Sequence, residues 1–390
     1  MATGSARKVK IAQVVTRMDW GGAPDIVRIL CESLESSYDV KLIIGPSKHL
    51  SEKTRLFLDK FRDNVFIIPH LKRDINPLWD FLALAKLFLL FKAERFDIVH
   101  THTAKAGFLG RIASWLAGIP TIIYMPHGHV FYGYFGLLMS RVAITVERVV
   151  ACITDKVMVL TELEKRDLIA FRVTTPDKIE VINSGLELEN YRQPVVDVQS
   201  KKNELQIEED ISVVGVIARL EPVKGHEYLI EAARMVTEEL PRVKFLIVGE
   251  GSLRNDLESQ CKELSVQDKF IFAGWQEDVC SILSTLDILV LPSVNEAVGR
   301  ILIEAGACGV PVVATNVGGI PEIVRDNVTG VLVAPRSPED LARAIIDLLN
   351  SEDKRQQMSI AAEQWIDDRF SAHRMVEEVS NSYDVLTARS

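Results

Sequence analysis

The sequence predicts an α/β protein made of two Rossmann-like, doubly wound domains that face each other across a central cleft. Short apolar, β-branched runs alternate with segments of helical periodicity along most of the chain. Such alternation is typical of parallel sheets with helices on both faces. The alternation pauses once, in a polar stretch at residues 187–210, and a chain of 390 residues is long enough for two domains of ordinary size.

The first domain is expected to contain seven strands. The strand-like runs are, in order, KIAQVV, VKLIIG, NVFIIP, DIVHTH, TIIYMP, KVMVLT and IEVINS. The amino-terminal residues before the first run show no pattern of a secretory leader. The apolar segment LWDFLALAKLFLLF is interrupted by Asp80 and Lys86. We therefore interpret it as a buried or amphipathic helix, and we expect no membrane-spanning helix.

The second domain is expected after the polar stretch, which contains Pro194 and is interpreted as a linker. Six further strand-like runs follow: SVVGVIARL, VKFLIVGEG, KFIFAGW, LDILVLPS, VPVVATN and TGVLVAP. The segment from Asp353 onward has helical character. Because ligands of open α/β sheets bind outside the carboxyl ends of the strands, candidate site residues are expected at those ends.

Composition narrows the class of protein. The five cysteines are scattered and form no C-x-x-C pair, which indicates a reducing, cytoplasmic compartment and argues against a thiolate zinc site. The net charge is −9, yet residues 41–150 carry 15 basic and 8 acidic side chains. This distribution argues against a general nucleic-acid-binding protein. It fits a basic first half that meets an anionic partner, such as lipid headgroups or phosphate.

Two glutamates, Glu296 and Glu304, lie eight residues apart where a strand-like run is followed by a helical segment, expected to begin near Val298 or Gly299. Eight helical residues rise about 12 Å, which is too far for the paired carboxylates of a glycosidase. The small residues Ala297 and Gly299 expose backbone N–H groups at the helix amino terminus, which favours an anion. The spacing fits an elongated ligand with hydroxyls at its ends and phosphate between them, such as a nucleotide-sugar. Solvated helix charges are the alternative.

Two cations follow the first strand expected in the second domain. Arg219 and Lys224 lie in the segment VIARLEPVKGHEYLIEAA, where the strand-like run ends. Two fixed cations at a strand end suit a diphosphate group. A solvated surface pair is the alternative interpretation.

Together these segments resemble a known family. The pair of glutamates followed by EAGACGVPVVATNVGGIPEIV, together with ARLEPVKG, is similar to the donor-binding half of glycosyltransferase family 4. Members of that family are retaining enzymes of the GT-B fold that use sugar nucleotides. The resemblance implies an acceptor-side domain of residues 1–188, joined by a final helix at about residues 370–390. It also implies a donor-binding domain of residues 189–369.

The resemblance further implies roles for individual residues. Glu304 would bind the ribose hydroxyls of the donor, and Glu296 would contact the transferred sugar. Arg219 and Lys224 would bind the diphosphate. The loops IVGEGSLR and FAGW resemble loops on the nucleobase side of the family's site. The further donor contacts implied are Ala297, Val298, Gly299 and Arg300, with Gly251, Gly274 and Trp275 at the nucleobase.

The first domain is expected to supply the other wall of the site. Gly21 and Gly22, in RMDWGGAPDIV, let the backbone approach the donor phosphate or the acceptor closely. His127, in MPHGHVFYGYFG, matches the family histidine that reaches the transferred sugar. The residues after it are expected to shape the acceptor side, with a packed hydrophobic loop as the alternative. They are His129, Phe131, Tyr132, Tyr134 and Phe135.

Two H-x-H pairs, His100 with His102 and His127 with His129, raise a zinc hypothesis, because alternate residues of a strand share a face. No cysteine or acidic residue clusters beside them in the sequence, and the chain has no D-x-D motif. We therefore expect no metal ion.

Val298 stands where the family often has an aromatic residue, which leaves the particular sugar open.

The sequence thus predicts a retaining glycosyltransferase that moves a sugar from a nucleotide diphosphate donor, expected to be UDP-linked, to an acceptor hydroxyl. The basic first half and the apolar segment fit a polyprenyl-linked sugar acceptor at the inner face of a membrane, in surface polysaccharide or glycolipid assembly. A soluble acceptor is the alternative. A sugar-nucleotide epimerase and a non-catalytic nucleotide-sugar binding protein are the rival classes. The base, the sugar and the oligomeric state stay open.

Overall fold

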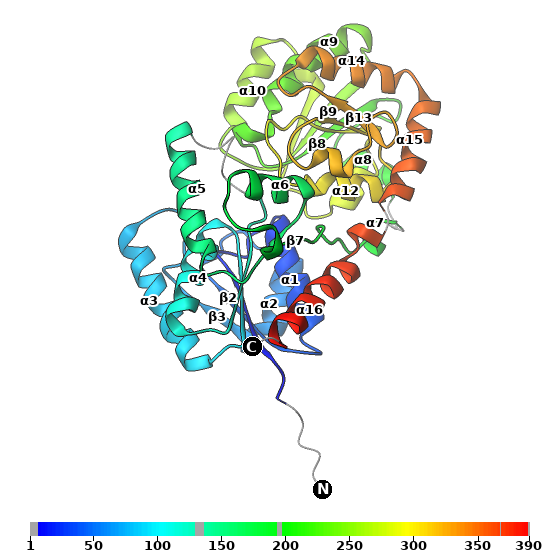
Figure 1. Ribbon diagram of the computed structural model, residues 1–390. Helices are drawn as coiled ribbons and strands as arrows, with labels where there is room; N and C mark the ends of the chain where they lie inside the picture. Colours follow the sequence, from blue (N-terminus) through cyan, green and yellow to red (C-terminus); the bar gives the residue numbers. More distant parts are fainter. Residues whose placement is uncertain (1–6, 129–135, 193–196, 367, 389–390) are drawn as a thin grey trace. The chain divides into compact units, whose positions relative to one another are not determined.

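The computed structural model describes residues 7–128, 136–192, 197–366 and 368–388. The chain divides into two compact units. The first unit comprises residues 1–185 together with 372–390, and the second comprises residues 186–371. Each unit contains its own parallel sheet with helices packed against it (Figure 1).

The first unit is built on a seven-stranded sheet in the order β3-β2-β1-β4-β5-β6-β7. Every neighbouring pair of strands is parallel. Each of the seven strand-like runs predicted for this part of the chain forms one strand. The strands are β1 (Lys10–Val15), β2 (Asp39–Ile44), β3 (Val65–Ile67), β4 (Ile98–His102), β5 (Thr121–Met125), β6 (Lys156–Val159) and β7 (Ile179–Val181).

Helices of the first unit connect successive strands. The final helix, α16, packs beside α1, so the two ends of the chain contribute to one unit (Figure 1). The helices are α1 (Gly22–Leu34), α2 (Glu52–Phe61), α3 (Pro77–Glu94), α4 (Ala104–Ala117), α5 (Leu137–Ala151), α6 (Glu162–Ala170) and α16 (Ala372–Thr387), with 3-10 turns η1 (Arg62–Asn64) and η2 (Pro176–Lys178).

Helix α3 corresponds to the apolar segment predicted as a buried or amphipathic helix. Asn76 caps its amino terminus by accepting hydrogen bonds from two backbone N–H groups, and Pro77 occupies its first position. The helix is confirmed, but it is neither buried nor simply amphipathic. Ala83, Leu87 and Phe91 are buried, whereas the apolar side chains of Leu78, Phe81 and Leu89 are between 63% and 66% exposed. Among the described residues, no helix is both long enough and apolar enough to cross a membrane.

The second unit is built on a six-stranded parallel sheet in the order β10-β9-β8-β11-β12-β13. Its core lies between this sheet and helices that include α9 and α14, with Phe245 stacked on Phe270 at 5.0 Å between ring centroids. The six predicted strand-like runs all form strands. These are β8 (Ser212–Ile217), β9 (Val243–Val248), β10 (Phe270–Gly274), β11 (Ile288–Leu291), β12 (Val312–Thr315) and β13 (Gly330–Val333).

The polar segment interpreted as a linker contains two short helices, α7 and α8. The Asp197 side chain caps α8 by accepting a hydrogen bond from the Ser200 N–H. Such a cap marks the start of a helix, but it is hard to recognise within a polar segment. The helices of this unit are α7 (Glu189–Arg192), α8 (Val198–Glu204), α9 (His226–Glu239), α10 (Arg254–Glu263), α11 (Val279–Leu283), α12 (Arg300–Ala307), α13 (Ile320–Ile323), α14 (Pro338–Leu349) and α15 (Glu352–Trp365), with 3-10 turns η3 (Pro222–Lys224), η4 (Gln267–Lys269) and η5 (Asp368–Phe370).

Each sheet has one point at which the order of its strands reverses. In the first unit this switch point lies between β1 and β4, and in the second it lies between β8 and β11. Loops leave such a pair of strands in opposite directions, which opens a crevice outside their carboxyl ends. The residues that follow β1, β4, β8 and β11 are therefore the first candidates for a functional site.

Candidate functional site

The switch point of the second unit carries an ion pair. Lys224 lies in the turn after β8, and its Nζ contacts Oε2 of Glu296, which follows β11. The side chains are 16% and 14% exposed. The buried hydroxyl of Ser293 donates to the same carboxylate oxygen at 3.2 Å. A cation and a carboxylate are thus held together at the carboxyl edge of the sheet, each still reached by solvent.

The backbone fixes the two loops that carry this pair. The N–H of Val294 donates to the carbonyl of Val223 at 2.9 Å, which joins the β11 loop to the β8 loop. Gly225 has φ of +66°, and a Cβ atom there would lie 2.1 Å from the carbonyl oxygen of Pro292. Only glycine allows the loops to approach this closely. The position of Lys224 relative to Glu296 therefore depends on main-chain packing.

The double glycine after β12 supports Glu296 from the other side. The N–H of Gly319 donates to the Glu296 carbonyl at 3.1 Å. Gly318 has φ of +55°, and a Cβ atom there would lie 1.6 Å from the same carbonyl oxygen. The Thr315 hydroxyl donates to the carbonyl of Ser293 at 2.5 Å. The β12 loop thus forms the support of the glutamate, a role that the sequence did not reveal.

Helix α12 begins at Arg300, with Gly299 as its cap in the left-handed region. The helix was expected to begin near Val298 or Gly299, and the structure places its cap at Gly299. Glu296 lies before the helix, so the helical rise does not apply to the whole interval from Glu296 to Glu304. Glu304 is partly exposed on α12, and Val298 is buried.

Arg219 lies between β8 and Lys224, but its partner is a different carboxylate. Its Nη1 contacts Oε1 of Glu221 at 2.6 Å, and its side chain is 39% exposed. The loops after the neighbouring strands β9 and β10 carry Gly251, Gly274 and Trp275. The N–H of Gly249 donates to the Gly274 carbonyl at 2.8 Å and ties these two loops together. The site residues predicted in the second unit therefore all lie at the carboxyl edge of one sheet or on α12, which follows it.

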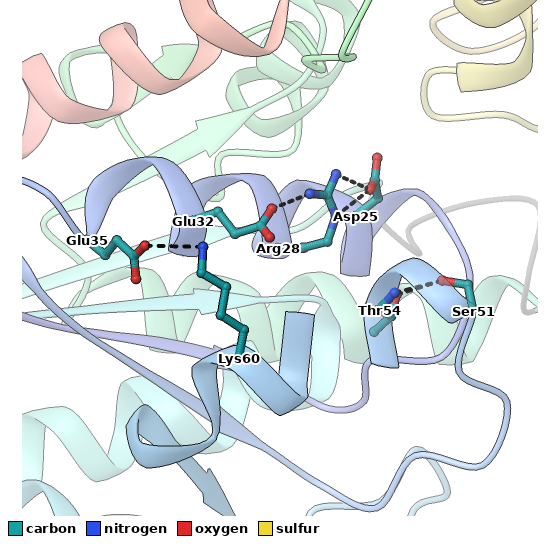
Figure 2. A network of polar contacts seen from close by, with 7 residues as sticks. All are labelled: Asp25, Arg28, Glu32, Glu35, Ser51, Thr54 and Lys60. Atoms are coloured by element: carbon teal, nitrogen blue, oxygen red, sulfur yellow. Dashed lines mark hydrogen bonds and ion pairs between the residues drawn. The ribbon is translucent and has the colours of Figure 1, made fainter. Parts of the chain in front are cut away.

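The first unit carries two glycines at its switch point. Gly21 is exposed with φ of +147° and precedes α1, whose first residue is Gly22. Figure 2 shows the charged residues of this helix: Arg28, only 3% exposed, contacts Asp25 at 2.9 Å and also contacts Glu32. The acidic residue lies in the first turn, where a helix favours negative charge. The two glycines thus lie at the start of a helix whose first turns are stabilised by ion pairs.

His127 follows β5 and is partly buried, with φ of +56°. Its Nε2 lies 2.9 Å from Nδ1 of His102, the last residue of β4. Burial, followed by the nearby His100 and His127, holds the pKa of His102 well below its usual value. Burial, followed by His127, lowers the pKa of His100 to about 3. These two imidazoles are therefore neutral at neutral pH.

The H-x-H pair on β4 does not form a ligand set. Nδ1 of His100 bonds to the hydroxyl of Tyr383, and Nε2 of His102 bonds to Oε1 of Gln13. Among the residues that the structure describes, no three histidine, cysteine or acidic side chains gather as metal ligands would. The second pair and the expected acceptor loop involve residues outside the described part of the chain: His129, Phe131, Tyr132, Tyr134 and Phe135.

The sequence did not reveal the hydrogen-bond partners of His100 and His102. Gln13 is fully buried within the apolar run KIAQVV, and a polar residue at the centre of such a strand was the available signal. Tyr383 lies 370 positions away from Gln13, so no local pattern could have joined them. Ser293 and Gly318 belong to segments that were noted only for their strand and turn character.

Two doubly wound sheets with polar groups at their switch points are typical of proteins that bind nucleotide-containing ligands. Residues 20–190 match the family described as Glycosyltransferase Family 4, and residues 197–365 match Glycosyl transferases group 1. The UDP-Gal:alpha-D-GlcNAc-diphosphoundecaprenol alpha-1,3-galactosyltransferase of Escherichia coli is 30% identical over 348 residues, 87% of each chain. The capsular polysaccharide biosynthesis glycosyltransferase CapM of Staphylococcus aureus is 28% identical, over 91% of this chain and 92% of CapM. The chain belongs to glycosyltransferase family 4 and is a glycosyltransferase.

Solved structures give the same fold. HepE from Anabaena, solved with UDP and glucose, superposes with a TM-score of 0.83 at 22% identity, over 97% of this chain and 100% of HepE. WaaG, a glycosyltransferase involved in lipopolysaccharide biosynthesis, gives a TM-score of 0.75 at 18% identity, over 95% of this chain and 98% of WaaG. The predicted family, enzyme class and GT-B type of fold are confirmed.

Proposed function

We propose that this glycosyltransferase moves a sugar from a UDP-sugar to an acceptor hydroxyl with retention at the anomeric carbon. The observation that carries the proposal is the contact of Lys224 with Glu296 across the switch point between β8 and β11. Two relatives support the choice of donor: HepE has been solved with UDP-glucose, and the name of the Escherichia coli relative specifies UDP-Gal.

The second unit is proposed to bind the donor. The diphosphate would contact Lys224, Arg219 and the backbone N–H groups at the start of α12, where the helix favours negative charge. Glu304 would bind the ribose hydroxyls, and Glu296 would contact the transferred sugar. In the present structure Lys224 is paired with the carboxylate of Glu296. An incoming diphosphate would therefore either displace Glu296 from Lys224 or share Lys224 with it.

The reaction is proposed to occur on one face of the sugar. The bond between the anomeric carbon and the β-phosphate oxygen breaks, and a bond to the acceptor oxygen forms on the same face. The departing phosphate takes the proton of the acceptor hydroxyl. Lys224 and Arg219 stabilise the charge that develops on the leaving diphosphate, and electrostatic stabilisation of this kind usually lowers the barrier more than any other effect in such a site. Because protein cations supply this charge, we propose that no metal ion is required.

The first unit is proposed to present the acceptor, with His127 contacting the transferred sugar and Gly21 and Gly22 approaching the reacting groups. A lipid-linked sugar is the acceptor that we favour. The name of the Escherichia coli relative specifies a diphosphoundecaprenol-linked acceptor, and CapM is named for capsular polysaccharide biosynthesis.

Exposed apolar side chains on three helices of the first unit support a lipid surface as the place of reaction. On α5, Leu138, Val142, Val146 and Val149 recur at helical spacing and are between 39% and 74% exposed. Exposed cations on or near these helices include Lys72, Arg73, Lys86, Lys92, Arg95, Arg141 and Arg148. The exposed apolar residues on α3 and α4 are Leu78, Trp79, Phe81, Leu82, Leu89, Phe108, Trp115 and Leu116. Apolar anchors with basic neighbours suit the anionic cytoplasmic face of a membrane.

A liposome assay tests the membrane proposal. Wild-type protein is expected to float with vesicles that contain anionic phospholipid at low salt, and Val146→Asp with Val149→Asp is expected to reduce the bound fraction. Leu56→Asp is the matched control, because Leu56 is 63% exposed on α2, outside the three helices. Equal binding by all three proteins, or no binding by the wild type, would contradict the proposal.

A product assay tests the reaction itself. The protein is incubated with UDP-sugars in the presence and absence of a polyprenyl diphosphate sugar. The expected result is free UDP together with an extended lipid-linked product, only when the acceptor is present. An isomerised UDP-sugar without acceptor would indicate an epimerase. Binding of UDP-sugar with no turnover for any acceptor would indicate a binding protein.

A further inference from the structure

Five polar side chains form a continuous hydrogen-bonded chain through the core of the first unit. It runs from His127 to His102 at 2.9 Å and from His102 to Gln13 at 2.7 Å. It continues from Gln13 to Tyr383 at 2.9 Å and from Tyr383 to His100 at 2.6 Å. Four of these side chains are fully buried, and His127 is the member with partial exposure.

The fold brings the members together from distant segments. Gln13 on β1 is directly opposite His100 on β4 in the parallel pairing at the switch point. Tyr383 comes from α16 and packs edge-on against Tyr38 at 5.9 Å between ring centroids. The hydrogen-bonded chain therefore connects helix α16 to the candidate site residue His127.

The direction of each hydrogen bond follows from the chemistry of Gln13. Its Nε2 donates to the hydroxyl of Tyr383, so its Oε1 faces His102 and can only accept. Nε2 of His102 therefore carries the proton. Since His102 is neutral, its Nδ1 has the lone pair and must accept from Nε2–H of His127.

The other end of the chain obeys the same logic. The Tyr383 oxygen accepts from Gln13 and consequently donates its own proton to Nδ1 of His100. Burial raises the pKa of Tyr383 above its ordinary value, which keeps that proton in place. Every hydrogen bond in the chain then has one donor and one acceptor, and no member needs to be charged.

We propose that Gln13 and Tyr383 are positioning residues that fix His127 in the tautomer with the proton on Nε2. In this tautomer Nδ1 of His127 is deprotonated and acts as a hydrogen-bond acceptor. It would accept from a hydroxyl group of the transferred sugar, whereas the opposite tautomer or the imidazolium would be a donor. The role of His127 toward the sugar rests on the proposed function; the tautomer itself does not.

The tautomer is measured by NMR on protein labelled with ¹⁵N-histidine, without any sugar nucleotide, with the His127 signals assigned by their absence in His127→Gln. The wild type is expected to show a protonated Nε2 and a deprotonated Nδ1 in His127. In Gln13→Leu and in Tyr383→Phe, the His127 signals are expected to shift toward a mixture of tautomers. Tyr38→Phe is the matched control: Tyr38 contacts Tyr383 and bonds to Ser380 and Asp384 but is not a member of the chain.

Kinetics supply the second readout. Loss of the hydrogen-bond partner of a metal-ligating histidine typically costs about tenfold to a hundredfold in activity, and we use that range as the guide for His127. We expect that loss of kcat/KM in Gln13→Leu and Tyr383→Phe, and wild-type values in Tyr38→Phe. Tyr383→Phe keeps the ring and its packing, so it serves if Gln13→Leu does not fold.

Two results would overturn the proposal. One is a wild-type His127 protonated on Nδ1, as an inverted Gln13 amide would require. The other is a folded Tyr383→Phe with the wild-type tautomer and wild-type kcat/KM. Failure of the proposed function looks different, because the wild type would then show the expected tautomer and transfer no sugar to any acceptor.

Discussion

The two switch points of this glycosyltransferase share a topology, but one carries charged side chains and the other carries neutral ones. Between β8 and β11, the second unit places Lys224 against Glu296, with Arg219 and Glu221 beside them, all still reached by solvent. Between β1 and β4, the first unit places Gln13, His100 and His102, which are fully buried. One switch point is charged and the other is neutral.

The difference teaches that the fold fixes where a site lies while side chains decide what it can do. Charges that remain partly hydrated can exchange one partner for another at modest cost, which suits the arrival of an anionic ligand. Buried neutral groups cannot rearrange without losing hydrogen bonds, which suits the fixing of one orientation. Four experiments test this contrast.

Acid should affect the neutral switch point most. His100 has a folded-state pKa of about 3, and burial holds that of His102 well below its usual value. Below pH 6.5 the histidines bind protons in the unfolded chain but not in the folded one. The free energy of unfolding therefore decreases as the pH is lowered, by roughly 1 kcal/mol per histidine and pH unit. The described part of the second unit has one such histidine, His226, with a pKa of about 4.

Hydrogen exchange measured between pH 7 and 4.5 checks this prediction. Amides of β1 and β4 are expected to lose protection at a higher pH, and more steeply as the pH falls, than those of β8 and β11. Loss of protection first in the second unit would contradict the contrast between the two regions.

Lys224→Ala should give the next largest effect. It removes a cation that is proposed to stabilise the leaving diphosphate, and turnover is expected to fall by about 10²–10³. The protein should remain folded, because the side chain lies at the sheet edge and outside the core. Turnover is measured by release of UDP in the presence of acceptor. Lys60→Ala is the control, since Lys60 is 71% exposed on α2; equal turnover by both variants would refute the assignment.

Tyr383→Phe should cost stability at the neutral switch point. The substitution leaves the amide of Gln13 and Nδ1 of His100 without their partner, and buried groups in that state cost about 1–3 kcal/mol. Denaturant unfolding of the variant and of Tyr38→Phe gives the comparison. We expect the larger loss for Tyr383→Phe, because the partners of Tyr38 include the exposed Asp384. An unchanged denaturation midpoint in Tyr383→Phe would show that the hydrogen-bonded chain does not stabilise the fold.

Glu221→Ala should have the smallest effect. Its ion pair with Arg219 joins side chains that are 28% and 39% exposed, and such pairs contribute about 0–1 kcal/mol. The unfolding free energy should therefore change by less than about 1 kcal/mol, in contrast to Tyr383→Phe. A loss as large as that of Tyr383→Phe would remove the distinction between the two regions.

The sequence predicted the strands well. Each predicted strand-like run became a strand, because apolar, β-branched runs bounded by turn residues have few alternatives. Arg219, Lys224 and Glu296 were singled out because they lie near the ends of such runs. Their contributions to the reaction stay predictions until they are measured.

The neutral switch point was not predictable in the same way. Gln13 and Tyr383 meet only after the chain has folded, and sequence patterns report neighbours within one element. His100 and His102 were noted as a pair, but their partners were not foreseen. The short helices α7 and α8 were not foreseen within the polar linker, because local caps such as Asp197 decide where short helices begin.

A crystal structure of this protein with UDP bound is the most direct test of the central claim. The account predicts that the diphosphate contacts Nζ of Lys224 and the side chain of Arg219, and that the ribose hydroxyls reach Glu304. UDP bound at another place, or Arg219 and Lys224 directed to bulk solvent beside a bound UDP, would contradict it.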